Sequence, residues 1–204
     1  MAEHKEPITK REANKIDVHQ RILKASRRLF ASKGYDETMM KDIAKKADVS
    51  KATVYNYFPN KESLLIGTLN NVIDEAFKIV EAKQDLPASE RLRIAFETFV
   101  LGGMKYPDLT RRITYLNSTD GSALYGSIGK IYQFFGKLID EAKENGEFDP
   151  DTDKYMIIDM VFGLFLIIQY QWIDIDRLSS IELLERMRHY YDRFIVQQFS
   201  PKDK

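Results

Sequence analysis

Residues 38–65 constrain the fold more strongly than any other part of the chain, because two short helices, a reversal and the start of another helix must fit into this segment. Met40, Ile43, Ala44 and Ala47 recur with the spacing of one helix face. Such spacing predicts a buried apolar stripe along the first short helix.

Residues with known backbone preferences mark the ends of these helices. Thr38 is placed to cap the first short helix, and Ser50 to cap the second. Asp48 stands at the reversal between them and tolerates left-handed backbone geometry. Pro59 disfavours continuation of the second helix, and Asn60 can cap the helix that follows.

The second short helix separates apolar from polar side chains. Val54 and Phe58 lie one turn apart and face inward. The opposite face carries Lys51, Ala52, Thr53, Tyr55, Asn56 and Tyr57. Two short helices joined by a tight turn are typical of a helix-turn-helix.

At these residues the chain resembles the TetR family of bacterial transcriptional repressors, over residues 16–65. The residues that match the family's DNA-binding signature are Asp42-Ile43-Ala44, Val49-Ser50-Lys51, Thr53-Val54-Tyr55-Asn56-Tyr57-Phe58, Asn60-Lys61-Glu62 and Leu64-Leu65. Two positions depart from it. Met39 stands where the family often has Ser or Thr touching a phosphate, and Asp48 replaces the usual turn glycine.

The resemblance implies a homodimer that binds a double-stranded DNA operator with inverted repeats. The residues expected to contact DNA are Thr38, Lys41, Ser50, Lys51, Ala52, Thr53, Tyr55, Asn56, Tyr57 and Lys61. Among them, Lys51, Thr53 and Tyr55 are expected at or near bases, and Lys41 is able to reach guanine. Thr38, Ser50, Asn56, Tyr57 and Lys61 are expected to hold phosphates.

The charge distribution agrees with a nucleic-acid partner for the N-terminal part. The whole chain has no formal net charge, but residues 1–66 contain 14 Lys or Arg against 9 Asp or Glu, and residues 67–204 contain 17 against 22. Such asymmetry suggests a basic DNA-binding part joined to a part with another task.

Other classes of function receive little support. There are no cysteines, and the three histidines are dispersed, so we expect no catalytic residues, no metal and no cofactor. The apolar run at residues 157–168 is too short to cross a bilayer, which takes about 20 residues. The charged N-terminus does not resemble a signal peptide. We therefore expect a cytoplasmic protein that is neither an enzyme nor bound to membranes.

The predicted fold is all-α, with about nine helices. Residues 1–14 are expected to form a disordered arm, and residues 15–66 a three-helix DNA-binding domain. A long helix from Lys61 to about Ala82 links this domain to residues 67–204, an antiparallel helical bundle for effector binding and dimerisation. Gly102-Gly103 is expected to end one bundle helix.

Aromatic side chains crowd the C-terminal half, where each one alone is more simply explained by core packing. Together they suit a mostly apolar pocket for an apolar or amphipathic small molecule. The residues expected to line it are Phe96, Phe99, Tyr115, Tyr125, Phe135, Asp159, Phe162 and Gln169. Asp159 could instead form an interface hydrogen bond or lie at an exposed edge, and Gly163 is expected to face the pocket.

The helix at about residues 152–173 is apolar nearly all round, so it needs cover on several sides. The resemblance implies that a second subunit supplies part of that cover. The residues expected at this dimer interface are Phe165, Leu184, Met187, Tyr191 and Phe194.

Two alternative functions remain open. A small-molecule binding protein with a vestigial helix-turn-helix would share the C-terminal half, but it has no reason to keep a polar face on residues 50–61. A eukaryotic-style three-helix DNA binder would share the N-terminal half, but its reading helix is typically longer than Pro59 allows here.

Overall fold

The computed structural model of the chain describes residues 9–105, 107–119, 121–171 and 180–201, and only the backbone of residues 105, 108, 115–119, 121–125, 168–171 and 180. All regular structure in these ranges is helical, which confirms the all-α prediction. The helices form two compact units, residues 1–71 and residues 72–204. The predicted boundary after residue 66 lies inside a continuous helix, α4 (Lys61–Glu81).

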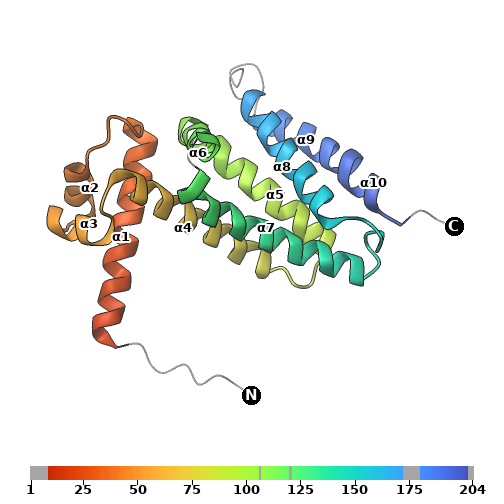
Figure 1. Cartoon of the computed structure of the whole chain (residues 1–204), viewed down its shortest axis with the longest axis horizontal. Helices are drawn as coiled ribbons and strands as arrows, with labels where there is room; N and C mark the ends of the chain where they lie inside the picture. Colours follow the sequence, from red (N-terminus) through yellow and green to blue (C-terminus); the bar gives the residue numbers. More distant parts are fainter. Residues whose placement is uncertain (1–8, 106, 120, 172–179, 202–204) are drawn as a thin grey trace. The chain divides into compact units, whose positions relative to one another are not determined.

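The first unit is built from α1 (Lys10–Lys33), α2 (Met40–Ala47), α3 (Lys51–Tyr57) and the start of α4. α2 packs on α1 and on α3 (Figure 1). The fully buried side chains that form this core are Ile22, Ile43, Val54, Leu64 and Leu65. Each such side chain stabilises the folded state by roughly 1.5–3 kcal/mol relative to an exposed one.

Most of the expected helix ends are confirmed. Asp48 adopts left-handed geometry with φ 54° and ψ 53°, and the Ser50 side chain accepts a hydrogen bond from the Thr53 N–H at 3.0 Å. The Asn60 side chain accepts from the Ser63 N–H at 2.7 Å.

Two predictions about helix starts are wrong. Thr38 does not cap α2, because Met39 occupies the cap position and the Thr38 hydroxyl donates instead to the Gly34 carbonyl, at 2.7 Å. α1 begins at Lys10, not near Ile16, because Thr9 and Glu12 form a capping box. The expected arm is thus helical over residues 10–14, and residues 1–8 lie outside the described part.

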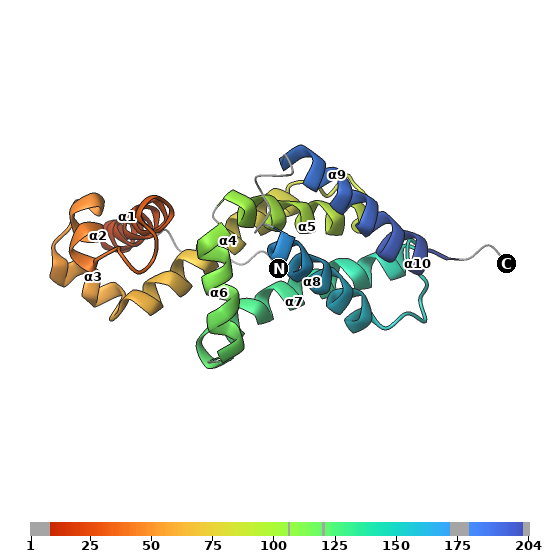
Figure 2. The same cartoon turned by 90° about the horizontal axis from the view of Figure 1, so that it is seen from above.

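The second unit is a helical bundle. Its helices are the end of α4, α5 (Ala88–Lys105), α6 (Pro107–Thr119), α7 (Gly121–Glu144), α8 (Lys154–Gln171), α9 (Ser180–Tyr191), the π-helix η2 (Asp192–Val196) and α10 (Gln197–Phe199). α5 and α8 pack between α7 and α9, and α6 runs across them (Figure 2). Counting α9 to α10 as one continuous helix, the described ranges contain nine helices. None of these helices is long and apolar enough to span a membrane.

The bundle core is drawn from every long helix of the unit. Its largest fully buried side chains are Leu92, Phe96, Ile139, Phe148, Ile157, Ile158 and Tyr191. On the last helix, the buried residues Leu183, Met187, Tyr191, Ile195 and Phe199 follow one another every four positions. Gly102-Gly103 does not end α5, which continues to Lys105. A glycine costs only about 1 kcal/mol in a helix, which neighbouring packing can offset.

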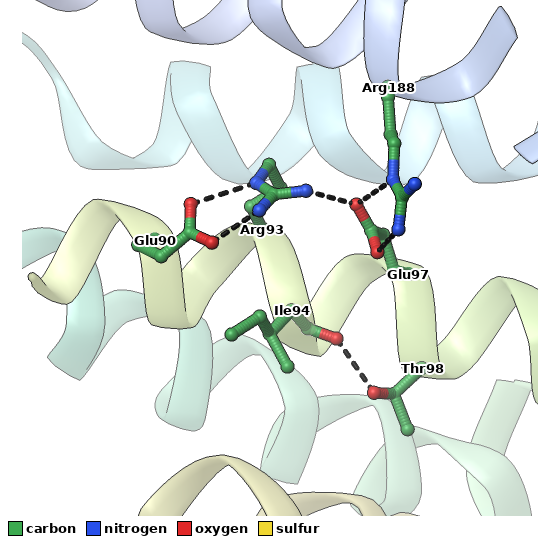
Figure 3. Close-up of polar contacts among 6 residues, drawn as sticks. All are labelled: Glu90, Arg93, Ile94, Glu97, Thr98 and Arg188. Carbon is green, nitrogen blue, oxygen red and sulfur yellow. Dashed lines mark hydrogen bonds and ion pairs between the residues drawn. The ribbon is translucent and has the colours of Figure 1, made fainter. Parts of the chain in front are cut away.

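A chain of ion pairs attaches α9 to α5 (Figure 3). The Glu97 carboxylate on α5 accepts from both Arg188 Nε and Arg188 Nη2 on α9, each at 2.9 Å. Arg93 lies between Glu97 and Glu90 and donates to both. Glu97 is only 12% exposed. Partial burial alone would raise the pKa of Glu97, but the hydrogen bonds and charges of Arg188 and Arg93 outweigh it, so the pKa is lowered.

Glu97→Gln tests this attachment through the pH dependence of stability. Because the folded-state pKa of Glu97 is below the unfolded one, its contribution is present at neutral pH and is lost as pH falls through the folded pKa, below about pH 4. We expect the variant to melt roughly 2–4 °C lower at neutral pH, corresponding to about 1 kcal/mol, with the difference shrinking in acid. Thermal unfolding followed by circular dichroism measures it. A pH-independent difference, or the same pattern in Glu81→Gln at an exposed position of α4, would contradict the assignment.

Gly67 allows α4 to approach the rest of the first unit closely. A Cβ added there would lie 2.6 Å from Phe58 Cε1 and 3.2 Å from Leu23 Cδ2. Both side chains are nearly fully buried, so neither is free to move away.

Gly67→Ala should therefore destabilise the protein, by roughly 1 kcal/mol net, because overpacking outweighs the gain in helix propensity. Gly126→Ala on α7 is the matched control, since an added Cβ there has nothing within 4 Å, and it should stabilise by up to about 1 kcal/mol. Urea unfolding of both variants measures the difference. Equal stabilisation by both would mean that Gly67 is not needed for packing.

Candidate nucleic-acid interface

The outward face of α3 is exposed and polar. Val54 is fully buried and holds the helix to the core, while Lys51, Tyr55 and Asn56 are exposed. The Lys51 ammonium lies 5.7 Å from the centroid of the Tyr55 ring, one turn further along. The Ser50 and Thr53 hydroxyls are 2.8 Å apart and bond to each other. Their hydroxyls therefore stabilise the start of α3.

A shallow groove of about 580 Å³ runs along this face, between α3, the start of α2 and the start of α4. Three lysines line it: Lys41, Lys51 and Lys61. Asp36 supplies an opposing charge, and Thr38, Met39, Met40, Tyr55, Pro59 and Asn60 complete the lining. The groove brings predicted DNA-contacting residues from three helices to one surface, and its excess of positive charge suits an anionic partner.

Thr38 has a different role from the predicted one. Its side chain is 1% exposed, and its hydroxyl is bonded to the Gly34 carbonyl. A phosphate cannot reach a hydroxyl in this position. The neighbouring Met39 is 55% exposed instead, and the sequence did not mark it as a contact because its thioether is a weak hydrogen-bonding group.

Lys61 is partly engaged within the protein. Its ammonium donates to the carbonyls of Tyr35 and Asp36, at 2.8 and 3.0 Å, and lies 4.5 Å from the Tyr35 ring centroid. An ammonium has three donors, so one remains for a phosphate. Lys61 therefore also fixes the turn between α1 and α2, a role that its position in the sequence did not reveal.

Arg21 is a second residue whose role the sequence did not reveal. Its guanidinium donates to the Ala47 carbonyl at 3.0 Å and to the Asp48 carbonyl at 3.4 Å. These bonds hold the left-handed turn from the side of α1. The signal was present only as a cation on the charged side of a predicted helix, which is ordinarily solvated.

These features decide the family. Residues 22–67 match the sequence model described as bacterial regulatory proteins, tetR family. The chain belongs to the TetR family. The HTH-type transcriptional repressor KstR of Mycolicibacterium smegmatis is 25% identical to it over 174 residues, covering 82% of each protein. YuxN, an uncharacterised HTH-type transcriptional regulator of Bacillus subtilis, is 35% identical over 85 residues, which are only 29% of that protein.

Solved structures of this TetR-family chain's relatives share its fold. FadR of Bacillus subtilis, determined in complex with stearoyl-CoA, superimposes with a TM-score of 0.70. The superposition covers 87% of this chain and 97% of that one, at 20% sequence identity. At this identity the likeness establishes the helical architecture of the two proteins.

The predicted pocket residues are only partly brought together. Phe96 and Phe135 are buried in the bundle core, and Phe99 and Phe162 are half-buried beside it. Asp159 is exposed on α8, where it accepts a hydrogen bond from the Tyr132 hydroxyl at 3.0 Å. The side chains of Tyr115, Tyr125 and Gln169 lie outside the described part of the structure.

The outward face of α8 differs from the prediction. Gly163 lies on this face, since it shares a helix side with the exposed Asp159, Leu166 and Ile167, and a Cβ added there has nothing within 4 Å. Its expected pocket position is therefore wrong. Tyr155 and Met156 extend the same face and are 59% and 53% exposed. Asp159 marked this side of α8 in the sequence, because an isolated carboxylate favours solvent over an apolar core.

The predicted dimer residues divide in the same way. Met187 and Tyr191 are at most 1% exposed within the subunit's own core, so their expected placement at a second subunit is wrong. The every-fourth-residue stripe they belong to faces inward. Phe165 and Leu184 are half-buried, and Phe194 is 47% exposed.

Proposed function

We propose that this TetR-family regulator represses transcription as a homodimer bound to an inverted-repeat operator, and that an apolar or amphipathic small molecule releases it. The carrying observation is the lysine-lined groove along an intact, capped α3. An α-helix fits the major groove of duplex DNA, and lysines suit guanine edges and phosphates. Lys51 and Tyr55 are proposed at the bases, and Lys61 at a phosphate.

The roles of Lys51 and Lys61 can be separated by their dependence on sequence and salt. Lys51→Ala should change which base is preferred at one position, losing about 1–3 kcal/mol of discrimination there. Lys61→Ala should weaken operator and unrelated duplexes alike, and lower the slope of log affinity against log salt by about one.

Selection from a random duplex pool, followed by titration of the selected operator at several salt concentrations, measures both effects. Lys46→Ala, at an exposed position near the end of α2, is the control and should leave base preference intact. If both Lys51→Ala and Lys61→Ala shift only general affinity, the assignment of Lys51 to base reading is wrong.

The outward face of α8 supports the homodimer. It presents apolar side chains to solvent along several turns, with Gly163 leaving room for a second helix at close range. Contiguous exposed apolar surface of this kind is typical of an interaction site. The exposed Phe194 is proposed to complete the contact.

Ile167→Asp should place an unpaired charge in that contact and leave monomers. The matched control is Ile79→Asp on α4, because Ile79 is 49% exposed and Ile167 is 53% exposed. Sedimentation at micromolar concentration measures the mass of each. A monomeric wild type, or dissociation by Ile79→Asp as complete as by Ile167→Asp, would contradict the proposed interface.

A row of aromatic rings in the bundle supports the effector site. Phe77 stacks on Phe134 at 3.9 Å between centroids, and Phe135 lies 5.9 Å from Phe99 and 6.1 Å from Phe162. All of these rings except Phe135 are half-buried rather than sealed in the core. Rings that retain partial access are suited to line an apolar site. We propose that the effector binds along this row.

Effector binding and DNA binding should oppose each other. A ligand that prefers the DNA-incompetent arrangement tenfold shifts the equilibrium by about 1.4 kcal/mol per site, and operator DNA must weaken the ligand by the same factor. Titrating the operator complex with fatty acyl thioesters, flavonoid-like aromatics and lipophilic cations tests this. The acyl thioesters come first because the FadR relative binds stearoyl-CoA. Phe99→Asp should abolish release, whereas release unaffected by this change would place the effector elsewhere.

A further inference from the structure

The first two turns of α1 project beyond the core of the first unit. Every residue from Lys10 to Asp17 is exposed, whereas Ile22 and Leu23 are buried. An uncovered helical segment has little tertiary stabilisation, and here the capping box at Thr9 fixes its start. The segment lies outside residues 22–67, which match the family, so it is a feature of this chain.

The projecting turns carry cations on one particular side. Arg11 and Lys15 lie eleven and seven positions before Ile22, so all three fall on the same face of α1. That face is apolar and buried where it meets α2 and α4, and it becomes cationic and exposed beyond them. Glu12 points its carboxylate back to Thr9 and is used in the capping box.

This side of α1 adjoins the end of the reading helix. The Tyr57 hydroxyl at the end of α3 donates to the Lys15 carbonyl, at 3.3 Å. One turn further along α1, the His19 ring stacks on Phe58 at 5.2 Å and lies 6.0 Å from Tyr57. The surface around Lys15 therefore continues from the polar face of α3.

We infer that Arg11 and Lys15 form a second phosphate-binding surface, which holds the DNA backbone beside the bases that α3 reads. The inference rests on the proposed function and adds to it. Two exposed cations suit phosphates because a phosphate contact requires charge and reach but no particular base. The partner is the operator duplex itself, contacted outside the bases that face Lys51 and Tyr55.

The test compares two double variants of the full-length protein that remove the same charge. R11Q/K15Q removes the proposed contacts, and K24Q/R28Q removes two exposed cations on the opposite side of α1. Glutamine retains helix propensity, so α1 should stay helical in both. R11K/K15R keeps the charges and should behave like the wild type.

Operator affinity is measured at several salt concentrations, with hydroxyl-radical footprinting of each complex. For R11Q/K15Q we expect the slope of log affinity against log salt to fall by about 1.8, from about 0.9 per phosphate. We also expect protection to be lost at the outer edges of the footprint, with base preference unchanged. K24Q/R28Q should change the slope much less.

Equal slope changes in the two double variants would overturn the inference, since the effect would then come from net charge. An unchanged slope and footprint in R11Q/K15Q would overturn it while the wild type still recognises its operator, leaving the proposed function intact. A wild type that does not distinguish any selected duplex from random DNA would overturn the proposed function and this inference together.

Discussion

The left-handed turn at Asp48 determines the direction in which α3 leaves α2, and the presentation of the reading face depends on that direction. The turn is closed by the bond from the Val49 N–H to the Ala44 carbonyl, at 3.0 Å, and its carbonyls are held by Arg21. Asp48 is the one non-glycine residue with positive φ in the described ranges. With the Ser50 cap, this turn faces Val54 inward and leaves Lys51 and Tyr55 for a partner. A small backbone choice thus controls which side chains can meet DNA.

Much of the first unit could be predicted because local rules determine it. Turn geometry at Asp48, capping by Ser50 and Asn60, and termination at Pro59 depend on a few neighbouring residues. Thr38 escaped prediction because two acceptable partners competed for its hydroxyl, and the Gly34 carbonyl was the nearer one in the fold. The early start of α1 was missed because the capping box at Thr9 was read as part of a charged tail.

The second unit was harder to predict because its helices are apolar on more than one side. Periodicity identifies α8 and α9 as helices, but it does not tell which apolar side faces the subunit's own core. Met187 and Tyr191 turned inward and Gly163 outward for this reason, since packing against α5 and α7 decides the choice. The ion pairs of Glu97 with Arg93 and Arg188 join residues 91 positions apart, beyond the reach of any local pattern.

The π-helix η2 has a consequence for the chain's length. In a regular α-helix each residue turns by about 100°, so a repeat of four drifts by about 40° per step. Over the four steps from Leu183 to Phe199 the drift would reach about 160°, taking the last side chains to the far side of the helix. The wider turn at Asp192–Val196 winds the chain back, so that Ile195 and Phe199 remain buried. Loss of a single residue within it would restore regular winding and expose both anchors, so this stretch tolerates substitution at its outer positions better than any change in residue number.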